Sequence, residues 1–496
     1  MRNKTLYRLT IAYLIIPNII YYLFWVNHVL SIICISLSAH LFLKTALQEM
    51  EPCKTFIHLK DLFIACIFAG MLTLASGITG FAFQTMDHWG HNGKFQALFQ
   101  NEWPLRFPAN GPVMAYYFGY YLVPAAFSKL AGHISSAAIL IWTSIGITLG
   151  LLWICISLHQ KWWAVLLALC VGDFPRFLKG IAAHWSIRLY RFEDIGVEHW
   201  SNLENLFWAP NQFIPSLILG GMLFYVIRHR LNYALLCFPT ALALWWAAFP
   251  ALATGLIVAL LLVFQWTRQG VSFCEFWEHA LLPFITVIPL LLLFQAHPQP
   301  PQNGPIWEFR LDTGNLVREY LVNTVADVAV FVLAFMTFRR VGLPGVSALP
   351  FCLLVCITLL FPLARVGKVN DMLLRGMMPV LVLIGCCLLY PLTSQPLPKV
   401  LTEIWGNAFY VVIVLVLLVP SGVGIARLYR ATRFNRITAL WGPHELKFAP
   451  IPYHAYPSLY ETLRQRWSQQ EAEQYLGKPD SFYEEYIAPP PKESLK

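Results

Sequence analysis

Charged residues are scarce in this sequence. Asp, Glu, Lys and Arg make up 12% of its 496 residues, whereas soluble globular chains carry about 25%. This fraction is too small to cover the surface of two or three water-soluble domains. The high hydrophobic content, 57%, also excludes a disordered chain and a coiled coil. An integral membrane protein is the class that remains.

Common catalytic and redox motifs are also missing. The sequence has no Walker A loop, no Gly-x-Ser-x-Gly, no His-Glu-x-x-His and no Rossmann glycine triplet, which argues against ATP-driven pumps, common serine hydrolases and zinc proteases. Its eleven cysteines form no Cys-x-x-Cys pair and most lie in apolar runs, so we expect neither a disulfide framework nor a thiolate metal site. The formal net charge is +9, and basic residues gather at the ends of apolar runs. This pattern predicts membrane lipids as partners and no nucleic acid.

Long apolar runs are what the sequence has in abundance. Runs of about 17–22 residues recur along the chain, and each can cross about 30 Å of hydrocarbon. We therefore predict an all-α, polytopic integral membrane helix bundle of about 12–14 transmembrane helices, with outer-face loops and short interfacial helices. The domain prediction is a transmembrane domain over 1–424 and a polar C-terminal tail over 425–496. The predicted spans are 9–26, 29–47, 61–81, 112–131, 134–158, 212–227, 232–248, 249–266, 280–296, 321–338, 344–364, 374–391 and 404–424.

The distribution of Lys and Arg gives a topology. A basic N-terminus predicts a cytoplasmic start, and the alternation of spans then places three loops outside, 82–111, 173–211 and 297–320. Residues 162–174 are too few to cross, so a re-entrant or interfacial segment is expected there. Thirteen crossings would leave the tail outside, whereas four arginines between 427 and 436 favour the cytoplasm. The sequence does not decide between these two placements.

The densest concentration of polar residues lies in the first outer loop. A carboxylate at a membrane exit can act as a general base toward a sugar hydroxyl, neighbouring cations can hold a phosphate, and aromatic rings can stack on a sugar or a polyprenyl chain. Alternatively, the acid caps the next helix, the histidines bond to the backbone, and the tyrosines form an interfacial belt. The candidates are Asp87 as catalytic base, with His88, His91, Lys94, Arg106, Tyr116 and Tyr117 as substrate-binding residues.

A second concentration lies in the loop 173–211. Glu198 and His199 can orient a hydroxyl or coordinate a divalent cation, but they lack a defined ligand spacing, so metal dependence stays open. For Glu193 and Asp194 we favour a solvated loop. The substrate-binding candidates from this region are Asp173, Glu198, His199, Trp208, Asn211 and Gln212.

A third concentration lies between the predicted spans 344–364 and 374–391. Three cations surround an Asn-Asp pair here, and if this loop is outer it breaks the positive-inside bias. A phosphate or pyrophosphate would then supply the missing counter-charge, whereas an ordinary cytoplasmic basic turn explains the pattern equally well. The candidates are Arg365, Lys368, Asn370, Asp371 and Arg375.

These three patches, in this order, resemble the GT-C superfamily of membrane glycosyltransferases, and more narrowly a group of polytopic bacterial membrane proteins of that kind. The resemblance covers residues from about 77 to 380. It implies a GT-C-like architecture, a location in a bacterial inner (plasma) membrane and, by position, a catalytic base at Asp87. It also implies a polyprenyl-phosphate-linked sugar donor whose phosphate meets Arg or Lys near the membrane surface. Two departures are that Asp87 is followed by His88 rather than a second acid, and that an extra hairpin of spans precedes the loop.

The function predicted from the sequence is transfer of a sugar from a polyprenyl-phosphate donor to a lipid or glycan acceptor at the outer face of the membrane. The alternative is a transporter or flippase of a lipid-linked or anionic solute. Polar residues inside the predicted spans are few, which counts against transport. A third reading is a non-catalytic envelope-assembly protein whose polar patches bind a partner.

Overall fold

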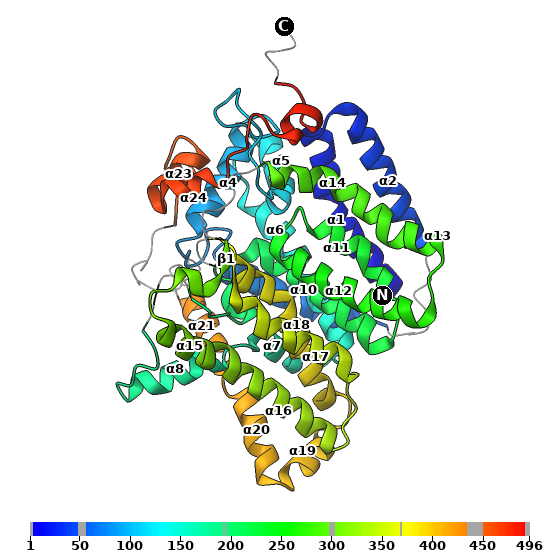
Figure 1. Cartoon of the computed structure of the whole chain (residues 1–496), viewed down its shortest axis with the longest axis vertical. Helices are drawn as coiled ribbons and strands as arrows, with labels where there is room; N and C mark the ends of the chain where they lie inside the picture. Colours follow the sequence, from blue (N-terminus) through cyan, green and yellow to red (C-terminus); the bar gives the residue numbers. More distant parts are fainter. Residues whose placement is uncertain are drawn as a thin grey trace.

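The structure is a computed structural model that describes residues 3–47, 56–191, 193, 196–296, 303–367, 370–433 and 450–491. Helices form nearly all of its secondary structure (Figure 1). In chain order the elements are α1 (Asn3–Trp25), α2 (His28–Leu47), α3 (Leu59–Ala75), α4 (His88–Gln100), α5 (Gly119–Ala131), α6 (Ser136–Ser157), α7 (Trp162–Cys170), α8 (Phe174–His184), α9 (Asn202–Asn205), α10 (Pro210–His229), η1 (Tyr233–Leu236), α11 (Cys237–Ala243), α12 (Ala248–Gln269), α13 (Phe273–Phe276), η2 (Trp277–Leu281), α14 (Leu282–Gln295), β1 (Gly304–Pro305), η3 (Ile306–Phe309), α15 (Thr313–Tyr320), η4 (Leu321–Val325), α16 (Ala326–Arg340), α17 (Ala348–Leu360), η5 (Phe361–Leu363), β2 (Ala364–Arg365), α18 (Asp371–Thr393), α19 (Leu397–Trp405), α20 (Ala408–Leu418), α21 (Ser421–Arg433), α23 (Leu459–Arg466), α24 (Gln469–Glu473) and η6 (Tyr483–Ile487).

Nine helices within the described residues are long and apolar enough to cross a membrane. This finding is compatible with a multi-pass membrane protein, as is the large number of exposed Leu, Ile, Val and Phe side chains on the outer helices. The nine helices are Asn3–Trp25, His28–Thr45, Ser136–Ser157, Pro210–His229, Ala248–Gln269, Phe273–Gln295, Thr313–Arg340, Asp371–Thr393 and Ala408–Ala431.

The remaining predicted spans are shorter than the sequence pattern indicates. α3 has 17 residues, α5 and α17 have 13 each, and residues 233–243 are divided between η1 and α11. In the predicted span 112–131 only the part from Gly119 onward is α-helical. The residues before it form an irregular segment that is buried against protein, including Val113, Met114 and Phe118. Hydropathy alone does not distinguish such protein-buried segments from lipid-crossing ones. α7 has nine residues, about 14 Å of helix, in keeping with a segment that does not cross.

The core is built around α10, whose whole apolar stretch is buried, between α6 and α18. Small residues allow these backbones to approach closely. A Cβ atom at Gly150 of α6 would lie 2.5 Å from Cβ of Leu217, and one at Gly220 of α10 would lie 2.8 Å from Cβ of Val382. This close packing fixes the relative positions of α10 and α18, which both begin at the candidate site.

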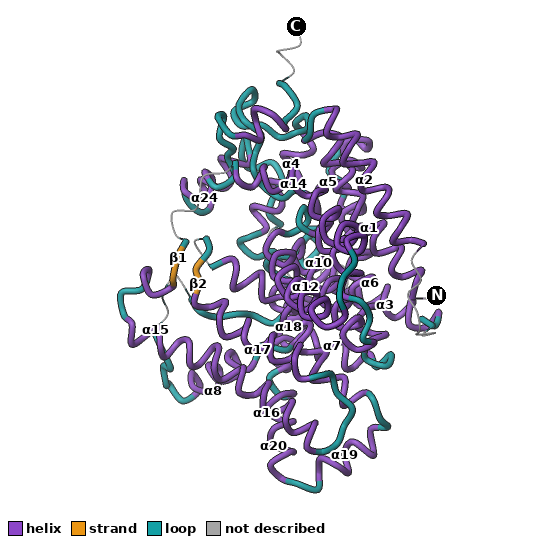
Figure 2. The backbone as a smooth tube through the Cα atoms, turned by 45° about the vertical axis from the view of Figure 1, so that its right-hand side comes forward, coloured by secondary structure: helices purple, strands orange, loops and turns teal. Residues whose placement is uncertain are grey.

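The elements that carry the polar patches meet at one end of the bundle. β1 and β2 pair antiparallel, with Gly304 opposite Arg365, and so join the segment before α15 to the segment before α18. Figure 2 shows this pair at the edge of the bundle, between α24 and α15. Figure 1 shows α23 and α24, drawn in orange-red, beside α4, and these C-terminal helices pack on α4. Part of the predicted tail therefore lies against the first polar loop, and α21 continues through the predicted boundary at residue 424.

Candidate functional site

A cavity of about 370 Å³ lies where α4, α10, α12 and α18 begin. Ten of the residues predicted from the sequence line it: five from the first polar patch, three from the second and two from the third. The C-terminal segment closes another side. The predicted residues in the wall are Asp87, His91, Lys94, Tyr116, Tyr117, Trp208, Asn211, Gln212, Asp371 and Arg375.

One face of α4 supplies the polar side of the cavity. Asp87, His91 and Lys94 are spaced by four and three residues, which places them on the same side of a helix. On another side of this helix Gly93 allows α23 to approach, since a Cβ atom there would lie 3.2 Å from Cδ1 of Leu459. The sequence around Asp87 therefore builds both a polar face and a docking face for the C-terminal segment.

Asp87 lies at the N-cap position of α4, but its side chain makes no capping hydrogen bond. The capping role that the sequence allowed is thus not adopted, and the carboxylate lines the cavity instead. Burial raises the pKa of Asp87, with a further contribution from Asp371, while Arg375 and Lys94 oppose the rise. A carboxyl group with a raised pKa beside two cations has the properties of a general base.

Lys94 carries its ammonium group into a cage of aromatic rings. Its Nζ lies 4.5 Å from the ring centre of Tyr116, 5.3 Å from that of Tyr475 and 5.4 Å from that of Tyr121. The residue is 4% exposed and has no ion pair or hydrogen bond to another residue that the structure describes. Burial lowers the pKa of Lys94 to about 7, and the charge of Arg375 acts in the same direction. The charge of Asp87 opposes this fall, but it forms no direct ion pair with Lys94, and a buried cation without such a pair favours the binding of an anion.

Arg375 is held at the opposite side by polar neighbours. Its guanidinium lies 2.9 Å from Oδ1 of Asp371, one turn earlier on α18, and donates to the hydroxyl of Tyr117 at 3.5 Å. Gln212 donates to the same hydroxyl at 3.0 Å. The position of the Asp371 carboxylate requires a glycine at residue 367. Gly367 has φ +78°, and a Cβ atom there would lie 2.4 Å from Oδ2 of Asp371. The third patch is thus a turn shaped to present Asp371 and Arg375 to the cavity.

The two histidines of α4 support the cavity wall through hydrogen bonds and ring packing. Nε2 of His91 lies 3.0 Å from the carbonyl oxygen of Trp208, so this nitrogen donates, and Nδ1 lies 2.6 Å from the hydroxyl of Tyr121 and accepts. Burial lowers the pKa of His91 well below its usual value and that of His88 to about 4. His88 is buried behind His91, with ring centres 5.3 Å apart. Both rings are therefore neutral at physiological pH and position the cavity wall.

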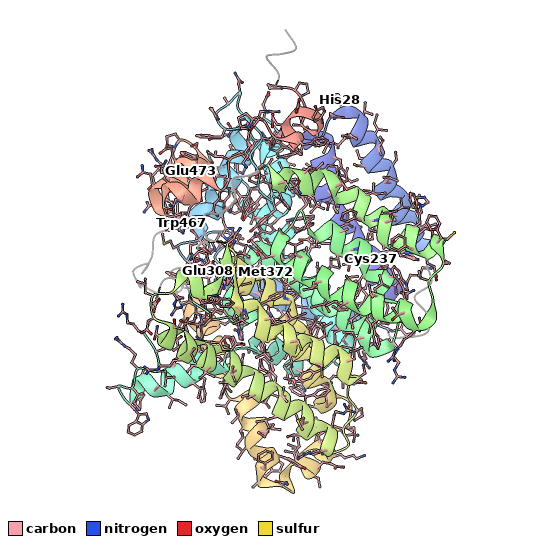
Figure 3. All side chains as sticks on the ribbon, in the orientation of Figure 1. His28, Cys237, Glu308, Met372, Trp467 and Glu473 are labelled. Atoms are coloured by element: carbon pink, nitrogen blue, oxygen red, sulfur yellow. The ribbon has the colours of Figure 1, made fainter. Side chains whose placement is uncertain are left out.

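The C-terminal segment supplies wall residues that the sequence interpretation missed. Tyr475 stacks on Tyr116 with ring centres 4.3 Å apart, and the main chain of Ala115 donates to the carbonyl of Tyr475. Figure 3 shows Trp467 beside the C-terminal helices, and this residue lines the cavity. The sequence feature that could have identified these wall residues is the recurrence of Trp and Tyr within a tail that is otherwise polar. The missed wall residues of this segment are Leu463, Trp467, Glu471, Gln474 and Tyr475.

Three of the predicted residues lie outside the cavity wall, in polar environments of their own. Glu198 lies 2.6 Å from Nζ of Lys179 and 3.5 Å from Nε of Arg176, outside the cavity wall. His199 forms a buried pair with Asp327, at 2.8 Å. Asp173 is buried where α8 begins, and burial raises its pKa to about 7. The second patch therefore does not converge on Asp87 as a unit; only Trp208, Asn211 and Gln212 reach the cavity.

The other predicted residues outside the cavity wall have structural environments of their own. Arg106 donates to the carbonyls of Gly111 and Pro489 and pairs with Glu484. Arg365 is buried over the ring of Phe309 and donates to the carbonyl of Gly367. Asn370 is the buried N-cap residue of α18, in a left-handed conformation. Lys368 and Asp194 lie outside the described residues.

Among the described residues, no group of three or more His, Cys, Asp and Glu side chains is arranged to hold a metal ion. Glu198 and His199, considered as ligands from the sequence, are instead engaged with basic residues and with Asp327. The side chains of Glu198 and His199 are therefore not arranged to bind a divalent cation.

The geometry thus places three acids (Asp87, Asp371 and Glu471), a lysine and an arginine around one cavity with aromatic and apolar walls. Comparison with protein-family models, with curated proteins and with solved structures found no match for this chain.

Proposed function

We propose that the protein is a GT-C-type membrane glycosyltransferase that transfers a sugar from a polyprenyl-phosphate donor to a lipid or glycan acceptor. The observation that carries the proposal is the uncapped carboxylate of Asp87 in a cavity that also holds Lys94 and Arg375. Transfer of a phosphate-linked sugar needs a base for the incoming hydroxyl and cations for the departing phosphate. All three groups are present within one enclosed space.

The proposed step balances without a further reactant. The carboxylate of Asp87 takes the proton of the acceptor hydroxyl, and the hydroxyl oxygen forms a bond to the anomeric carbon of the sugar. The bond between that carbon and the phosphate oxygen breaks, and the electron pair leaves with the polyprenyl phosphate. Lys94 and Arg375 face the negative charge that develops on this leaving group.

The cavity walls agree with a donor that has both a polar head and a hydrocarbon chain. Phe249, Leu252 and Phe294 form an apolar side of the cavity, contributed by the helices α12 and α14. Leu252 is also 50% exposed, so this wall extends to the outer surface of α12. A polyprenyl chain would leave the cavity along this helix, while Tyr116 and Trp208 offer flat faces for a sugar.

The proposal is tested by incubating the purified protein, in lipid nanodiscs, with a panel of radiolabelled polyprenyl-phosphate sugars and a membrane-lipid extract. A new labelled product, identified by mass, is the supporting result and names the donor. If no member of the panel yields a new glycosidic bond while the protein binds the donor, the proposal of transfer fails.

Transport remains the second candidate, and the buried pair of His199 and Asp327 favours it. Asp327 lies on the long helix Thr313–Arg340, and its partner His199 comes from the segment before α9. Ionisable residues inside membrane helices commonly mark ion pathways. Proteoliposomes distinguish the two functions, because a transporter moves the intact donor across the membrane without forming a new bond. Replacement His199→Gln should abolish such movement if this alternative holds.

A further inference from the structure

A second groove, of about 560 Å³, lies between α8, α9 and α21. Its polar side is formed by arginines from two helices, and its apolar side by Phe177, Val419 and Val423. Trp208 belongs to the wall of both this groove and the cavity that contains Asp87. None of the three sequence patches predicted a site at this position.

Two of the arginines, Arg176 and Arg427, share the buried carboxylate of Glu204. Oε2 of Glu204 lies 2.9 Å from Arg176 and 3.5 Å from Arg427, and Oε1 accepts a hydrogen bond from the indole of Trp208 at 2.9 Å. The two guanidinium groups also lie over aromatic rings, Arg176 over Trp200 and Arg427 over Phe207. Arg176 also lies 3.5 Å from Glu198. Each guanidinium has five N–H donors, so these contacts still leave donors of both arginines unused.

Arg430 adds a third cation to the groove. It is exposed and has no ion pair or hydrogen bond to another residue that the structure describes. Within the wall three arginines face one carboxylate, a net charge of +2. The neighbouring charges do not reverse this sign, because Lys179 pairs with Glu198 and burial raises the pKa of Asp173 to about 7.

The groove also lies at a boundary between apolar and polar surface. The spanning helix Ala408–Ala431 is apolar over most of its length and carries Arg427 and Arg430 near its end. Beside it, α8 places Arg176 and Lys179 on one side and is followed by the exposed residues Trp185 and Ile187, which are 71% and 57% accessible. Such a mixture of basic and exposed aromatic residues is typical of a helix at the membrane interface. Figure 1 shows α8 and α21 in the same region of the molecule, and the two helices are in contact.

We propose that this groove binds the headgroup of an anionic phospholipid, with the phosphate between Arg176, Arg427 and Arg430 and the acyl chains along Val419 and Val423. A bidentate contact between a guanidinium and a phosphate satisfies the donors that Glu204 leaves unused. The apolar wall gives the hydrocarbon a place that a free phosphate would not fill. This site is separate from the cavity of Asp87, and its occupancy does not depend on the proposed transfer reaction.

The test measures phosphatidylglycerol bound to the purified full chain in detergent, by native mass spectrometry. Arg430→Ala should weaken binding by about tenfold, because a charge-assisted contact is lost. Arg268→Ala is the matched control, since Arg268 is an exposed arginine at the far end of α12, and it should leave binding unchanged. Equal losses in the two variants, or no loss in Arg430→Ala, would overturn the proposal.

A second variant separates a lipid from a free phosphate. Val423→Trp fills the apolar side of the groove without changing its charge, so it should reduce phosphatidylglycerol binding. Competition with glycerol phosphate, a soluble headgroup, should displace the lipid only weakly. If Val423→Trp binds the lipid normally and glycerol phosphate displaces it fully, the groove is a phosphate site and the lipid assignment is wrong. Thermal unfolding of each variant checks that the fold is retained.

Discussion

The ammonium nitrogen of Lys94 lies 4.5 Å from the ring centre of Tyr116 and forms no ion pair with an acidic side chain among the described residues. The rings of Tyr121 and Tyr475 complete a cage around it. Such a cage stabilises a cation only in part, since burial still lowers the pKa of Lys94 to about 7. The charge on this side of the cavity therefore depends on pH in the physiological range.

We predict that donor binding weakens as the pH rises above 7. Below pH 7 Lys94 is protonated and attracts the phosphate, and above it the neutral amine does not. The loss should be about tenfold per pH unit until binding without this charge dominates. A polyprenyl-phosphate sugar is a suitable probe, because its phosphodiester keeps one charge over pH 6–9. Isothermal titration calorimetry over this range measures the effect.

The control for this prediction is Lys94→Arg. An arginine stays protonated throughout, so the variant should bind the donor with little change between pH 6 and pH 9. Equal pH profiles for the wild type and for Lys94→Arg would show that another group is responsible.

Replacement of Asp87 by Asn should remove catalysis while leaving donor binding nearly intact. Loss of a general base lowers kcat by about 10²–10⁴-fold, whereas the cations that hold the donor remain. The charge of Asp87 opposes the fall in the pKa of Lys94, so the variant is best assayed near pH 6, where Lys94 is still protonated. Radiolabelled transfer and donor affinity are measured in parallel.

An acid outside the cavity serves as the control for Asp87. Asp480 is exposed in the C-terminal segment, and Asp480→Asn should transfer sugar at the wild-type rate. Unchanged kcat in Asp87→Asn, with normal expression in membranes, would eliminate Asp87 as the base.

Gly367→Ala should lower donor affinity through Asp371. The added Cβ atom would lie 2.4 Å from Oδ2 of Asp371, which displaces the carboxylate that holds Arg375 at 2.9 Å. We expect about a tenfold loss of affinity, in addition to about 1 kcal/mol of stability lost because alanine disfavours a positive φ. Donor binding and thermal unfolding are the measurements.

Gly342 offers a matched control for the backbone effect. It has φ +75°, close to the +78° of Gly367, but a Cβ atom added to Gly342 would meet no described atom within 4 Å. Gly342→Ala should therefore lose similar stability and keep its affinity. If both variants lose affinity equally, the contact with Asp371 is not the cause.

The sequence was sufficient for the all-α fold class. Apolar runs predicted a helical bundle because hydrocarbon length sets helix length. The concentration of polar residues after the third apolar run pointed to Asp87, His91 and Lys94, which the structure places in one cavity wall. The sequence did not predict the environment of Glu198, because its partners Arg176 and Lys179 lie on a different element. The role of a charged residue depends on which charge lies opposite, and that is decided by tertiary packing.

The C-terminal segment shows why a low hydropathy is a poor guide to a domain boundary. Tyr475 and Trp467 bury aromatic surface against the cavity while their neighbours stay polar, so the average over the tail hides them. Glycines at 90 and 93 in α4 were the corresponding signal, because they leave space for Leu459 and Leu463. Such complementary features are recognised only once the two segments are seen together.

The sequence suggests Arg106 as a phosphate-binding residue. In the structure it joins the loop 82–111 to the C-terminal segment, through Glu484 and the carbonyl of Pro489. Glu484 also accepts a hydrogen bond from the main chain of Val113 at 3.0 Å. We therefore expect both Arg106→Ala and Glu484→Gln to loosen the C-terminal segment and to raise its sensitivity to protease. Limited proteolysis followed by mass spectrometry measures the release.

Glu485→Gln is the control, because Glu485 is the exposed neighbour of Glu484, and it should leave the segment protected. Donor affinity should fall in Arg106→Ala and Glu484→Gln alike, since Trp467 and Tyr475 leave the cavity wall in both. A residue that binds the phosphate directly would behave differently, because Arg106→Ala would then weaken the donor complex without releasing the segment, and Glu484→Gln would have no such effect. The pair of variants thus separates an anchor for the cavity wall from a ligand of the donor.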